Sequence, residues 1–555
     1  MSAVEVNPKS SIDVNNGYCA KTKTYHSLMP NTALPPESVP LSVTDYTFSL
    51  LKNLPSPESS TALIDADTGY RISFSELIRR SRNLAAYLQN KIGLVNGETA
   101  FILSPNSIYT TVLHFSLFSL GVIISPSNPA NTESEIAHQI NLIKPAIAFA
   151  TKTTSSKIPP LRHSTILLDS SDFHSMMTSE SITELKSVSV SQSDVAAILY
   201  SSGTTGKTKG VKLTHRNWIA AIQIAKSLST ASAPAPAEEK PVVFCVVPCF
   251  HVYGFAFSVV YIALGGSVVL MDRFDMGRMM RGIERFGVTL LAVAPPVIIN
   301  MVKNDEVMDG YDLSSLKIVV SGGAVLPKWN IEKFANRFPH VQIVQGYGLT
   351  ESIGGVSRQM GPEDLKVIGT VGRLCPNWVA KVVDPETGVS LPPLKQGELW
   401  IKGPTLMQGY VGDDEATSAS MDLEGWYRTG DLVYFDNKGL VFFVERLKEL
   451  IKYKGYQVAP ADLEHVLQSH PDVVEAAVIP FPDEEAGQIP MAFVVRRRES
   501  TIDEAEIKDF VARQVAPYKK IRRVSFIDSI PRNAAGKVLR KELIKLAQKN
   551  VSSKL

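Results

Sequence analysis

Cysteine is scarce in this sequence. Four cysteines occur among 555 residues, at positions 19, 245, 249 and 375, which is too few and too scattered for the disulfide framework of a small secreted domain. Cys245 and Cys249 lie four residues apart in the apolar segment VVFCVVPCF, where we interpret them as small buried hydrophobic residues and not as a metal pair. No zinc-ligand spacing occurs, so the sequence favours neither a disulfide scaffold nor a zinc module.

An excess of charge is also missing. The 57 Lys and Arg residues and the 55 Asp and Glu residues leave a formal net charge of +2, which argues for neither nucleic-acid binding nor attraction to a membrane surface. The uncharged stretch 108–125 contains His114, Gly121 and several hydroxyl residues ahead of Pro126. We therefore predict a buried helix followed by a strand there, and no membrane span.

Neither end of the sequence has the pattern of a folded element. The beginning lacks a charged and then apolar signal peptide, and its first forty residues are polar and proline-rich, so we expect residues 1–40 to form a disordered extension. The last three residues are Ser553, Lys554 and Leu555, the tripeptide that a peroxisomal import receptor reads at a free C-terminus. We therefore expect a peroxisomal protein that binds this receptor.

The length and the hydrophobic pattern predict more than one domain. A chain of 555 residues exceeds what a single core usually supports. Apolar runs such as VVFCVV and TLLAVAP alternate with helical stretches such as MGRMMRGIERFG, which is typical of parallel sheets covered by helices. Short strands follow around 388–403, and the segment 433–446 predicts a hairpin that turns at 437–439. We expect a large α/β domain over 41–446 and a small α+β domain over 447–552.

The segment YSSGTTGKTKG, at 200–210, is typical of a phosphate-binding loop. Its glycines allow successive backbone N–H groups to turn inward around an anion, and Lys207 and Lys209 add positive charge. A Walker A loop requires glycine where this sequence has Ser201, and it opens a helix directly, whereas VKLTH at 211–215 predicts a second strand. A flexible linker fits poorly, because apolar strand-like segments flank the loop on both sides.

Four later segments extend the pattern: QGYGLTE at 345–351, YRTGDL at 427–432, ERLKELIKYKGYQVAP at 445–460 and PRNAAGK at 531–537. With the glycine-rich loop they resemble, in order and spacing, the signatures of the AMP-forming acyl-activating enzymes, most closely the plant 4-coumarate:CoA ligase-like branch. The resemblance covers about residues 45–545. It implies a large N-terminal domain of α/β sheets with a small β-barrel-like subdomain, and a small mobile α+β C-terminal domain that rotates about a hinge at Lys448.

The resemblance also implies an ATP site. Asp431 matches the family aspartate that holds the ribose hydroxyls, and Arg446 matches the arginine beside it. Glu351 matches the Mg²⁺ ligand, and one carboxylate is enough because Mg²⁺ also takes phosphate oxygens. The adenine and phosphate groups would be bound by residues of two segments, with Lys448 nearby: Gln345, Gly346, Tyr347 and Thr350, together with Ser201, Ser202, Gly203, Thr204, Thr205 and Lys209.

The catalytic residues are likewise implied by the resemblance. Lys537 matches the lysine that supports acyl-adenylate formation, since a positioned cation stabilises negative charge on the phosphates. Rotation of the small domain would then replace it by Lys452 and Gln457, for transfer of the acyl group to coenzyme A. The remaining matches concern coenzyme A and the end of the acyl pocket that receives the carboxylate: Lys454 and Gly455 for pantetheine, Arg273 for the nucleotide phosphate, and His251 for the carboxylate.

The residues that match the family's acyl pocket differ from those of hydroxycinnamate-using relatives. They are Tyr253, Phe257, Gly323, Gly354 and Gly355. Those relatives carry a small polar residue at the position of Phe257 and Pro-Val at the positions of Gly354 and Gly355. In this sequence the pocket wall at Phe257 therefore gains bulk, and the wall at the two glycines loses it. Three further departures, Val325 for proline, Glu445 for aspartate and Arg532 for lysine, leave the expected mechanism intact.

The sequence thus predicts an acid:thiol ligase. It would convert a hydrophobic carboxylic acid, ATP and coenzyme A, with Mg²⁺, to acyl-CoA, AMP and pyrophosphate. The acid is either aromatic, of the cinnamate or coumarate type, or a fatty or jasmonate-precursor acid. Two alternatives remain: oxidation of the adenylate, as in luciferases, and a catalytically silent binding protein. We expect a monomer that binds no nucleic acid.

Overall fold

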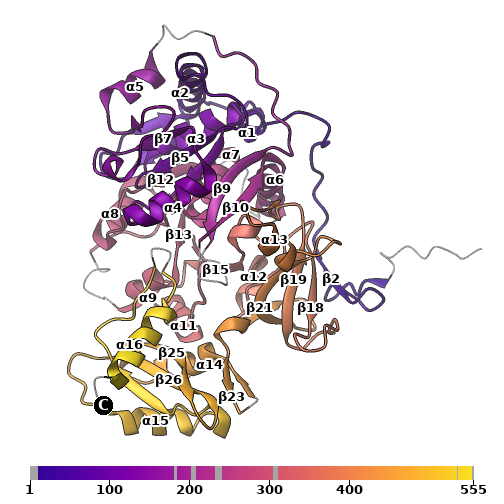
Figure 1. The fold of residues 1–555 in the computed structure, drawn as a ribbon, viewed down its shortest axis with the longest axis vertical. Coiled ribbons are helices and arrows are strands. Elements are labelled where there is room, and N and C mark those ends of the chain that lie inside the picture. Colours follow the sequence, from indigo (N-terminus) through magenta and orange to yellow (C-terminus); the bar gives the residue numbers. More distant parts are fainter. Residues whose placement is uncertain are drawn as a thin grey trace, which may run out of the picture.

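The computed structural model describes residues 11–179, 184–201, 208–231, 240–303, 310–454, 456–533 and 536–552. Its two largest sheets are stacked in the upper part of Figure 1, a smaller antiparallel sheet lies beside them, and the C-terminal domain, drawn in yellow, lies below. This is the α/β fold with a separate C-terminal domain that the sequence predicts. No helix in the described ranges is both long and apolar enough to cross a membrane.

The first large sheet is mainly parallel and forms the centre of the N-terminal domain. Its strands from β15 to β3 run parallel to their neighbours. The strand order, with bounds, is β17 (Arg373–Leu374), β16 (Ser357–Arg358), β15 (Gln342–Tyr347), β14 (Ile318–Ser321), β13 (Leu290–Val293), β11 (Val242–Cys245), β12 (Ser267–Leu270), β3 (Thr61–Asp65) and β4 (Arg71–Ser73).

The second large sheet includes the two strands that flank the glycine-rich loop. Strand β9 (Val195–Ser201) pairs antiparallel with β10 (Lys209–Thr214), so the two predicted strands are confirmed. The other strands are β20 (Gly409–Tyr410), β6 (Ile123–Pro126), β5 (Thr99–Leu103), β7 (Ile147–Ala150) and β8 (Ile166–Leu167). The predicted buried helix and strand over 108–125 are also confirmed, as α3 (Ile108–Ser119) followed by β6.

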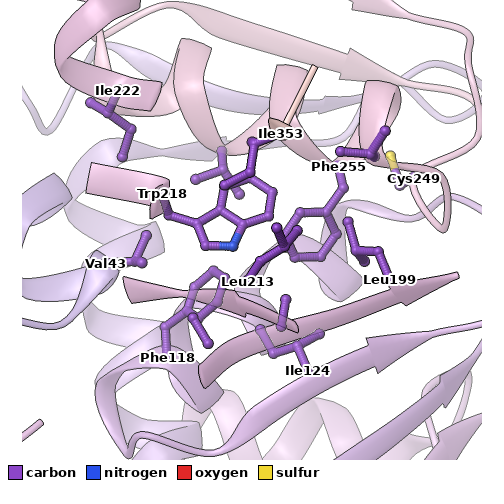
Figure 2. Close-up of a cluster of buried hydrophobic side chains, with 14 of the residues drawn as sticks. Val43, Phe118, Ile124, Leu199, Leu213, Trp218, Ile222, Cys249, Phe255 and Ile353 are labelled. Atoms are coloured by element: carbon purple, nitrogen blue, oxygen red, sulfur yellow. The ribbon is translucent and has the colours of Figure 1, made fainter. Parts of the chain in front are cut away.

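Helices cover both large sheets. They are α1 (Val43–Leu51), α2 (Phe74–Tyr87), α4 (Glu133–Ile143), α5 (Ser171–Thr178), α6 (His215–Ala231), α7 (Val252–Ala263), α8 (Met276–Phe286), α9 (Pro295–Lys303) and α11 (Lys328–Arg337). Trp218 of α6 is completely buried, and its ring lies 4.9 Å from that of Phe255 in α7 (Figure 2). Because interiors are tightly packed, this cluster fixes the positions of α6 and α7.

The third sheet corrects one expectation from the sequence. Strands β1 (Tyr18–Cys19) and β2 (Thr24–His26) join it beside β18 (Val379–Val383), so the prediction of disorder for 1–40 is wrong within 11–40. Tyr25 is fully buried and stacks on Phe435 with ring centroids 4.0 Å apart, which holds the segment in place. The sheet continues with β19 (Gly397–Lys402), β21 (Tyr427–Phe435) and β22 (Val441–Arg446). Strands β21 and β22 form the predicted hairpin. The helices α12 (Gly361–Leu365) and α13 (Asp414–Ser420) lie nearby in the sequence.

The C-terminal domain has its own sheet and core. Strands β23 (Ile451–Tyr453), β24 (Tyr456–Val458), β25 (Val473–Asp483), β26 (Gly487–Arg496) and β27 (Arg523–Phe526) form the sheet, and the helices are α14 (Pro460–Gln468), α15 (Glu504–Ala512) and α16 (Arg540–Ser552). Its two main apolar clusters contain no residue of the N-terminal domain, and a small third cluster packs Leu450 and Ala459 against Leu432 of β21. The tripeptide 553–555 lies outside the described residues.

Candidate active site

A cavity of about 1180 Å³ lies where the two large sheets, the third sheet and the C-terminal domain meet. Its polar end is lined by residues of β9, β10, β15 and the β21–β22 hairpin, and by Asn533 and Lys537 of the C-terminal domain. Its other end, which we call the apolar arm, is lined mainly by α6 and α7: Ala221, Ile224, Ala225, Leu228, Ala256, Phe257, Val260, Tyr261 and Leu264. One continuous cavity thus joins a polar site to an apolar channel.

An aspartate, an arginine and a tyrosine are clustered at the polar end. The Tyr347 hydroxyl donates a hydrogen bond of 2.5 Å to Asp431 Oδ2, and Arg446 Nε lies 3.3 Å from Asp431 Oδ1. Asp431 is only 1% exposed, and burial raises the pKa of its carboxyl although the charge of Arg446 opposes the rise. Asp431 Oδ1 accepts no hydrogen bond from the described residues, so it is available to a ligand hydroxyl.

Glu351 lies in the same part of the cavity. Its carboxylate is 7% exposed and Oε1 accepts a hydrogen bond of 3.0 Å from the Tyr410 hydroxyl, which lies 3.2 Å from the Tyr427 hydroxyl. The ammonium group of Lys209 lies 4.7 Å from the centroid of the Tyr410 ring. A single buried carboxylate suits Mg²⁺ that is bound together with phosphate, because Mg²⁺ takes few protein carboxylates.

The glycine-rich loop itself is described only at its two ends. Ser201 is paired with Lys209 across β9 and β10, and both line the cavity. The Ser201 hydroxyl is buried without a hydrogen-bond partner in the described part of the chain. Ser202, Gly203, Thr204 and Thr205 lie outside the described residues.

Lys537 reaches the cavity from the C-terminal domain. Its backbone N–H donates 2.8 Å to Asn533 Oδ1, Asn533 N–H donates 2.9 Å to the Lys537 carbonyl, and Gly536 has a φ of +80°, so a tight turn presents the lysine. Its ammonium group lies 3.8 Å from Glu449 Oε1. Burial, together with the positive charge of Arg446, lowers the pKa of Lys537 to about 8, although Glu449 opposes the shift.

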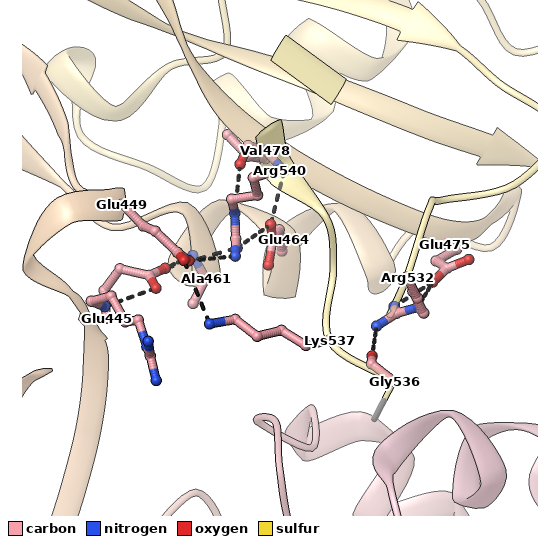
Figure 3. Close-up of polar contacts among 11 residues, drawn as sticks. Glu445, Glu449, Ala461, Glu464, Glu475, Val478, Arg532, Gly536, Lys537 and Arg540 are labelled. Atoms are coloured by element: carbon pink, nitrogen blue, oxygen red, sulfur yellow. Dashed lines mark hydrogen bonds and ion pairs between the residues drawn. The ribbon is translucent and has the colours of Figure 1, made fainter. Parts of the chain in front are cut away.

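A network of charges connects Lys537 to the junction between the domains (Figure 3). Arg540 donates hydrogen bonds of 2.7 Å to Glu449 and to Glu464, and it lies 4.0 Å from Glu445. Burial raises the pKa of Glu445 to about 7, and Arg540 opposes that rise. The sequence motifs did not single out Glu449 or Arg540, because only the folded chain brings these residues, 91 positions apart, into contact.

The residues expected to serve acyl transfer do not line this cavity. Lys452 and Gln457 face each other across β23 and β24 and are exposed, and Lys454 forms an ion pair with Glu485. Arg273 follows β12 and is exposed, and Lys448 lies in a short helical turn after β22, where burial lowers its pKa. Gly455 lies outside the described residues. In this arrangement of the domains only Lys537, of the two expected lysines, reaches the polar end.

His251 and the expected pocket residues lie at the junction of the polar end and the apolar arm. His251 begins α7, where its Nδ1 accepts a hydrogen bond of 3.3 Å from Tyr253 N–H, and burial lowers its pKa. The Tyr253 hydroxyl donates 2.9 Å to the Val320 carbonyl. Besides Ser201, Lys209, Arg446 and Lys537, the expected residues that line the cavity are His251, Tyr253, Phe257, Gly323, Gln345, Gly346, Tyr347, Thr350, Glu351, Gly354 and Gly355.

Family models and known proteins agree on the class of this protein. Residues 53–411 match the family "AMP-binding enzyme" and residues 462–537 match "AMP-binding enzyme C-terminal domain". The chain therefore belongs to the AMP-binding enzymes, and its fold is that of adenylate-forming acyl-CoA synthetases.

Curated relatives place the chain among the 4-coumarate:CoA ligase-like proteins, a branch of ATP-dependent acyl-CoA ligases. It is 47% identical to 4-coumarate--CoA ligase-like 9 from Arabidopsis thaliana, over 99% of this chain and 100% of the relative. It is 43% identical to Peroxisomal OPC-8:0-CoA ligase 1 from the same plant, over 98% and 99%. ATP-bound MatB from Rhodopseudomonas palustris superimposes with a TM-score of 0.81 at 26% identity, covering 91% of this chain and 99% of that chain.

Proposed function

We propose that this enzyme activates a hydrophobic carboxylic acid in two steps, first as an acyl-adenylate and then as a coenzyme A thioester. One observation carries the proposal: Lys537, Arg446 and the apolar arm all line a single cavity, and Asp431 lies directly behind this lining, 3.3 Å from Arg446. A nucleotide held at the polar end and an acid held in the arm would meet near His251.

In the first step, a carboxylate oxygen of the acid attacks the α-phosphorus of ATP and pyrophosphate leaves. Asp431 would accept hydrogen bonds from the ribose hydroxyls, with Arg446 holding its charge. The ammonium group of Lys537 would stabilise the negative charge on the phosphate oxygens, an interaction that is strong in a cavity with little water. Mg²⁺ bound by Glu351 would supply further neutralisation of the phosphate charge.

In the second step, the thiolate of coenzyme A attacks the acyl carbon and AMP leaves with the bridging oxygen. The exposed positions of Lys452, Lys454 and Gln457 suit a step for which the C-terminal domain rotates about Lys448. This rotation would withdraw Lys537 and separate Arg540 of the C-terminal domain from Glu445 of the N-terminal domain. Arg273, which is exposed beside the large sheet, would then bind the nucleotide phosphate of coenzyme A.

The apolar arm favours a long acid over a short one. Residues from Tyr253 to Leu264 line it along one face of α7, and at ~1.5 Å per residue this face is about 16 Å long. The rings of Tyr253, Phe257 and Tyr261 form its wall, with neighbouring centroids 5.0 and 5.2 Å apart. Together with the peroxisomal relative and the C-terminal tripeptide, this supports a peroxisomal enzyme for fatty or jasmonate-precursor acids.

A pyrophosphate-release screen tests the proposal. The purified enzyme is given ATP, Mg²⁺ and coenzyme A with aromatic acids, saturated fatty acids and oxygenated fatty acids, and its products are identified. We expect AMP, pyrophosphate and an acyl-CoA, with long aliphatic acids preferred over 4-coumarate. Release of ADP and phosphate, or the absence of a thioester with every acid, would contradict the proposal.

A further inference from the structure

Arg358 lines the cavity and has no partner in the part of the chain that the structure describes. Arg358 ends β16 and lies directly opposite Gly346 of β15, so its side chain is on the same face of the sheet as the Gly346 position. Its guanidinium group forms no hydrogen bond or ion pair with any residue in the described ranges.

The surroundings of Arg358 belong to the apolar arm. Tyr253 and Tyr261 of α7 line the same cavity, and the positive charge of Arg358 opposes the rise in pKa that burial causes at both hydroxyls. The Tyr253 hydroxyl already donates to a backbone carbonyl, whereas the Tyr261 hydroxyl has no hydrogen-bond partner among the described residues. Two unused polar groups, a guanidinium and a phenol, thus face an otherwise apolar channel.

Among the described residues, no carboxylate forms an ion pair with Arg358. Four carboxylates line the cavity within the described ranges, and none forms an ion pair with Arg358: Glu351 binds Tyr410, Glu398 binds Trp400 and the Gly430 N–H, Asp413 caps α13, and Glu415 lies in its first turn. A charged group in a partly dehydrated cavity is costly unless it is paired. A ligand that brings an acceptor oxygen to this point would remove that cost.

We infer that Arg358, assisted by Tyr261, binds an acceptor oxygen on the acyl chain of the substrate, remote from the reacting carboxylate. The inference rests on the proposed ligase function and narrows its substrates to long aliphatic acids that carry a keto group or a second carboxylate. At ~1.3 Å per bond, an extended chain along the face of α7 has room for about a dozen bonds. Arg358 is therefore a specificity-determining residue, and it takes no part in the chemical step.

The test compares acids of matched chain length. Pyrophosphate release is measured with a saturated fatty acid, the corresponding keto acid and the corresponding dicarboxylic acid, for the native enzyme and for Arg358→Met, Arg358→Lys and Tyr261→Phe. Arg498→Met, at an exposed arginine of the C-terminal domain, is the matched control. We expect the native enzyme and the control to prefer an oxygenated acid by about tenfold to a hundredfold in kcat/KM, the effect of one charge-assisted hydrogen bond.

The variants should change the ratio of kcat/KM with the oxygenated acid to kcat/KM with the saturated acid. Arg358→Met should lose the preference and keep activity with the saturated acid, Arg358→Lys should retain part of it, and Tyr261→Phe should weaken it. Whichever oxygenated acid the native enzyme prefers identifies the group that Arg358 binds, a keto oxygen or a second carboxylate. Either preference supports the inference.

Three results would overturn it. They are a native enzyme without any preference, an equal loss of activity with all acids in Arg358→Met at unchanged Tm, and a raised KM for ATP in that variant. The last two would place Arg358 in the folding or nucleotide binding of the protein. A native enzyme that releases no pyrophosphate with any acid would instead contradict the ligase proposal itself, so the two failures are distinguishable.

Discussion

The rate of acyl-adenylate formation should depend on the protonation of Lys537. Only the charged ammonium stabilises the phosphate oxygens, and burial beside Arg446 lowers the pKa of this lysine from 10.5 to about 8. The charged fraction then falls about tenfold between pH 7 and pH 9, whereas a lysine with an ordinary pKa would hardly change. We expect kcat/KM for ATP, which reports the free enzyme, to fall about tenfold over this range.

The assay is ATP–pyrophosphate exchange without coenzyme A, because a free thiol ionises in the same pH range. Two variants isolate the lysine. Lys537→Arg keeps its charge at high pH, so the alkaline fall should disappear even if the rate is lower. Glu449→Gln removes the carboxylate that opposes the loss of the proton, so the fall should begin at lower pH. Glu485→Gln, which removes the partner of Lys454 away from the cavity, is the control for the second variant.

A flat native profile up to pH 10, or the same alkaline fall in Lys537→Arg, would refute this reasoning. The first result would mean that the lysine has an ordinary pKa or no role in the first step. The second would assign the fall to another group.

Four further predictions follow from the site. Lys537→Ala should lose adenylate formation but keep thioester formation from supplied acyl-adenylate, and Lys452→Ala should show the reverse; equal losses in both half-reactions would contradict the two positions of the domain. Asp431→Asn should raise the KM for ATP by about tenfold or more with little change in Tm, because a ribose acceptor is lost; an unchanged KM would count against that role. Because the pKa of Glu445 is raised, the folded state holds the Glu445 proton more tightly than the unfolded state does, and the free energy of unfolding falls as the pH rises from 4.5 to about 7. Glu445→Gln should therefore reduce the difference in Tm between pH 5 and pH 8. An unchanged difference would argue against a raised pKa. Phe257→Ser should shift the ratio of kcat/KM values toward aromatic acids, since it removes bulk from the arm; an unchanged ratio would exclude Phe257 from the acyl pocket.

Much of the fold follows from local sequence patterns. The apolar runs that become β9 and β10, the helix and strand over 108–126, and the hairpin of β21 and β22 are each specified by a few adjacent residues. The strands β1 and β2 were missed because they have only two and three residues. Their order depends on pairing with β18, more than 350 positions later, and no local pattern reports such a contact.

The candidate site divides in the same way. Motifs were enough to single out Lys537, Asp431 and Glu351, because each lies in a short segment with a recognisable order of residues. Arg358 and Arg540 carry no such signal, since an arginine is usually a solvated surface residue. Only the structure shows that Arg358 lines a cavity without a partner among the described residues, and that Arg540 connects carboxylates of both domains.

The fate of the carboxylate oxygens tests the central claim most directly. The enzyme is given ATP, coenzyme A and an accepted acid whose carboxylate is labelled with heavy oxygen, and the AMP is examined by mass spectrometry. Attack of the carboxylate on the α-phosphorus predicts that each AMP formed carries one labelled oxygen. AMP without label, or label found in inorganic phosphate beside ADP, would contradict the account.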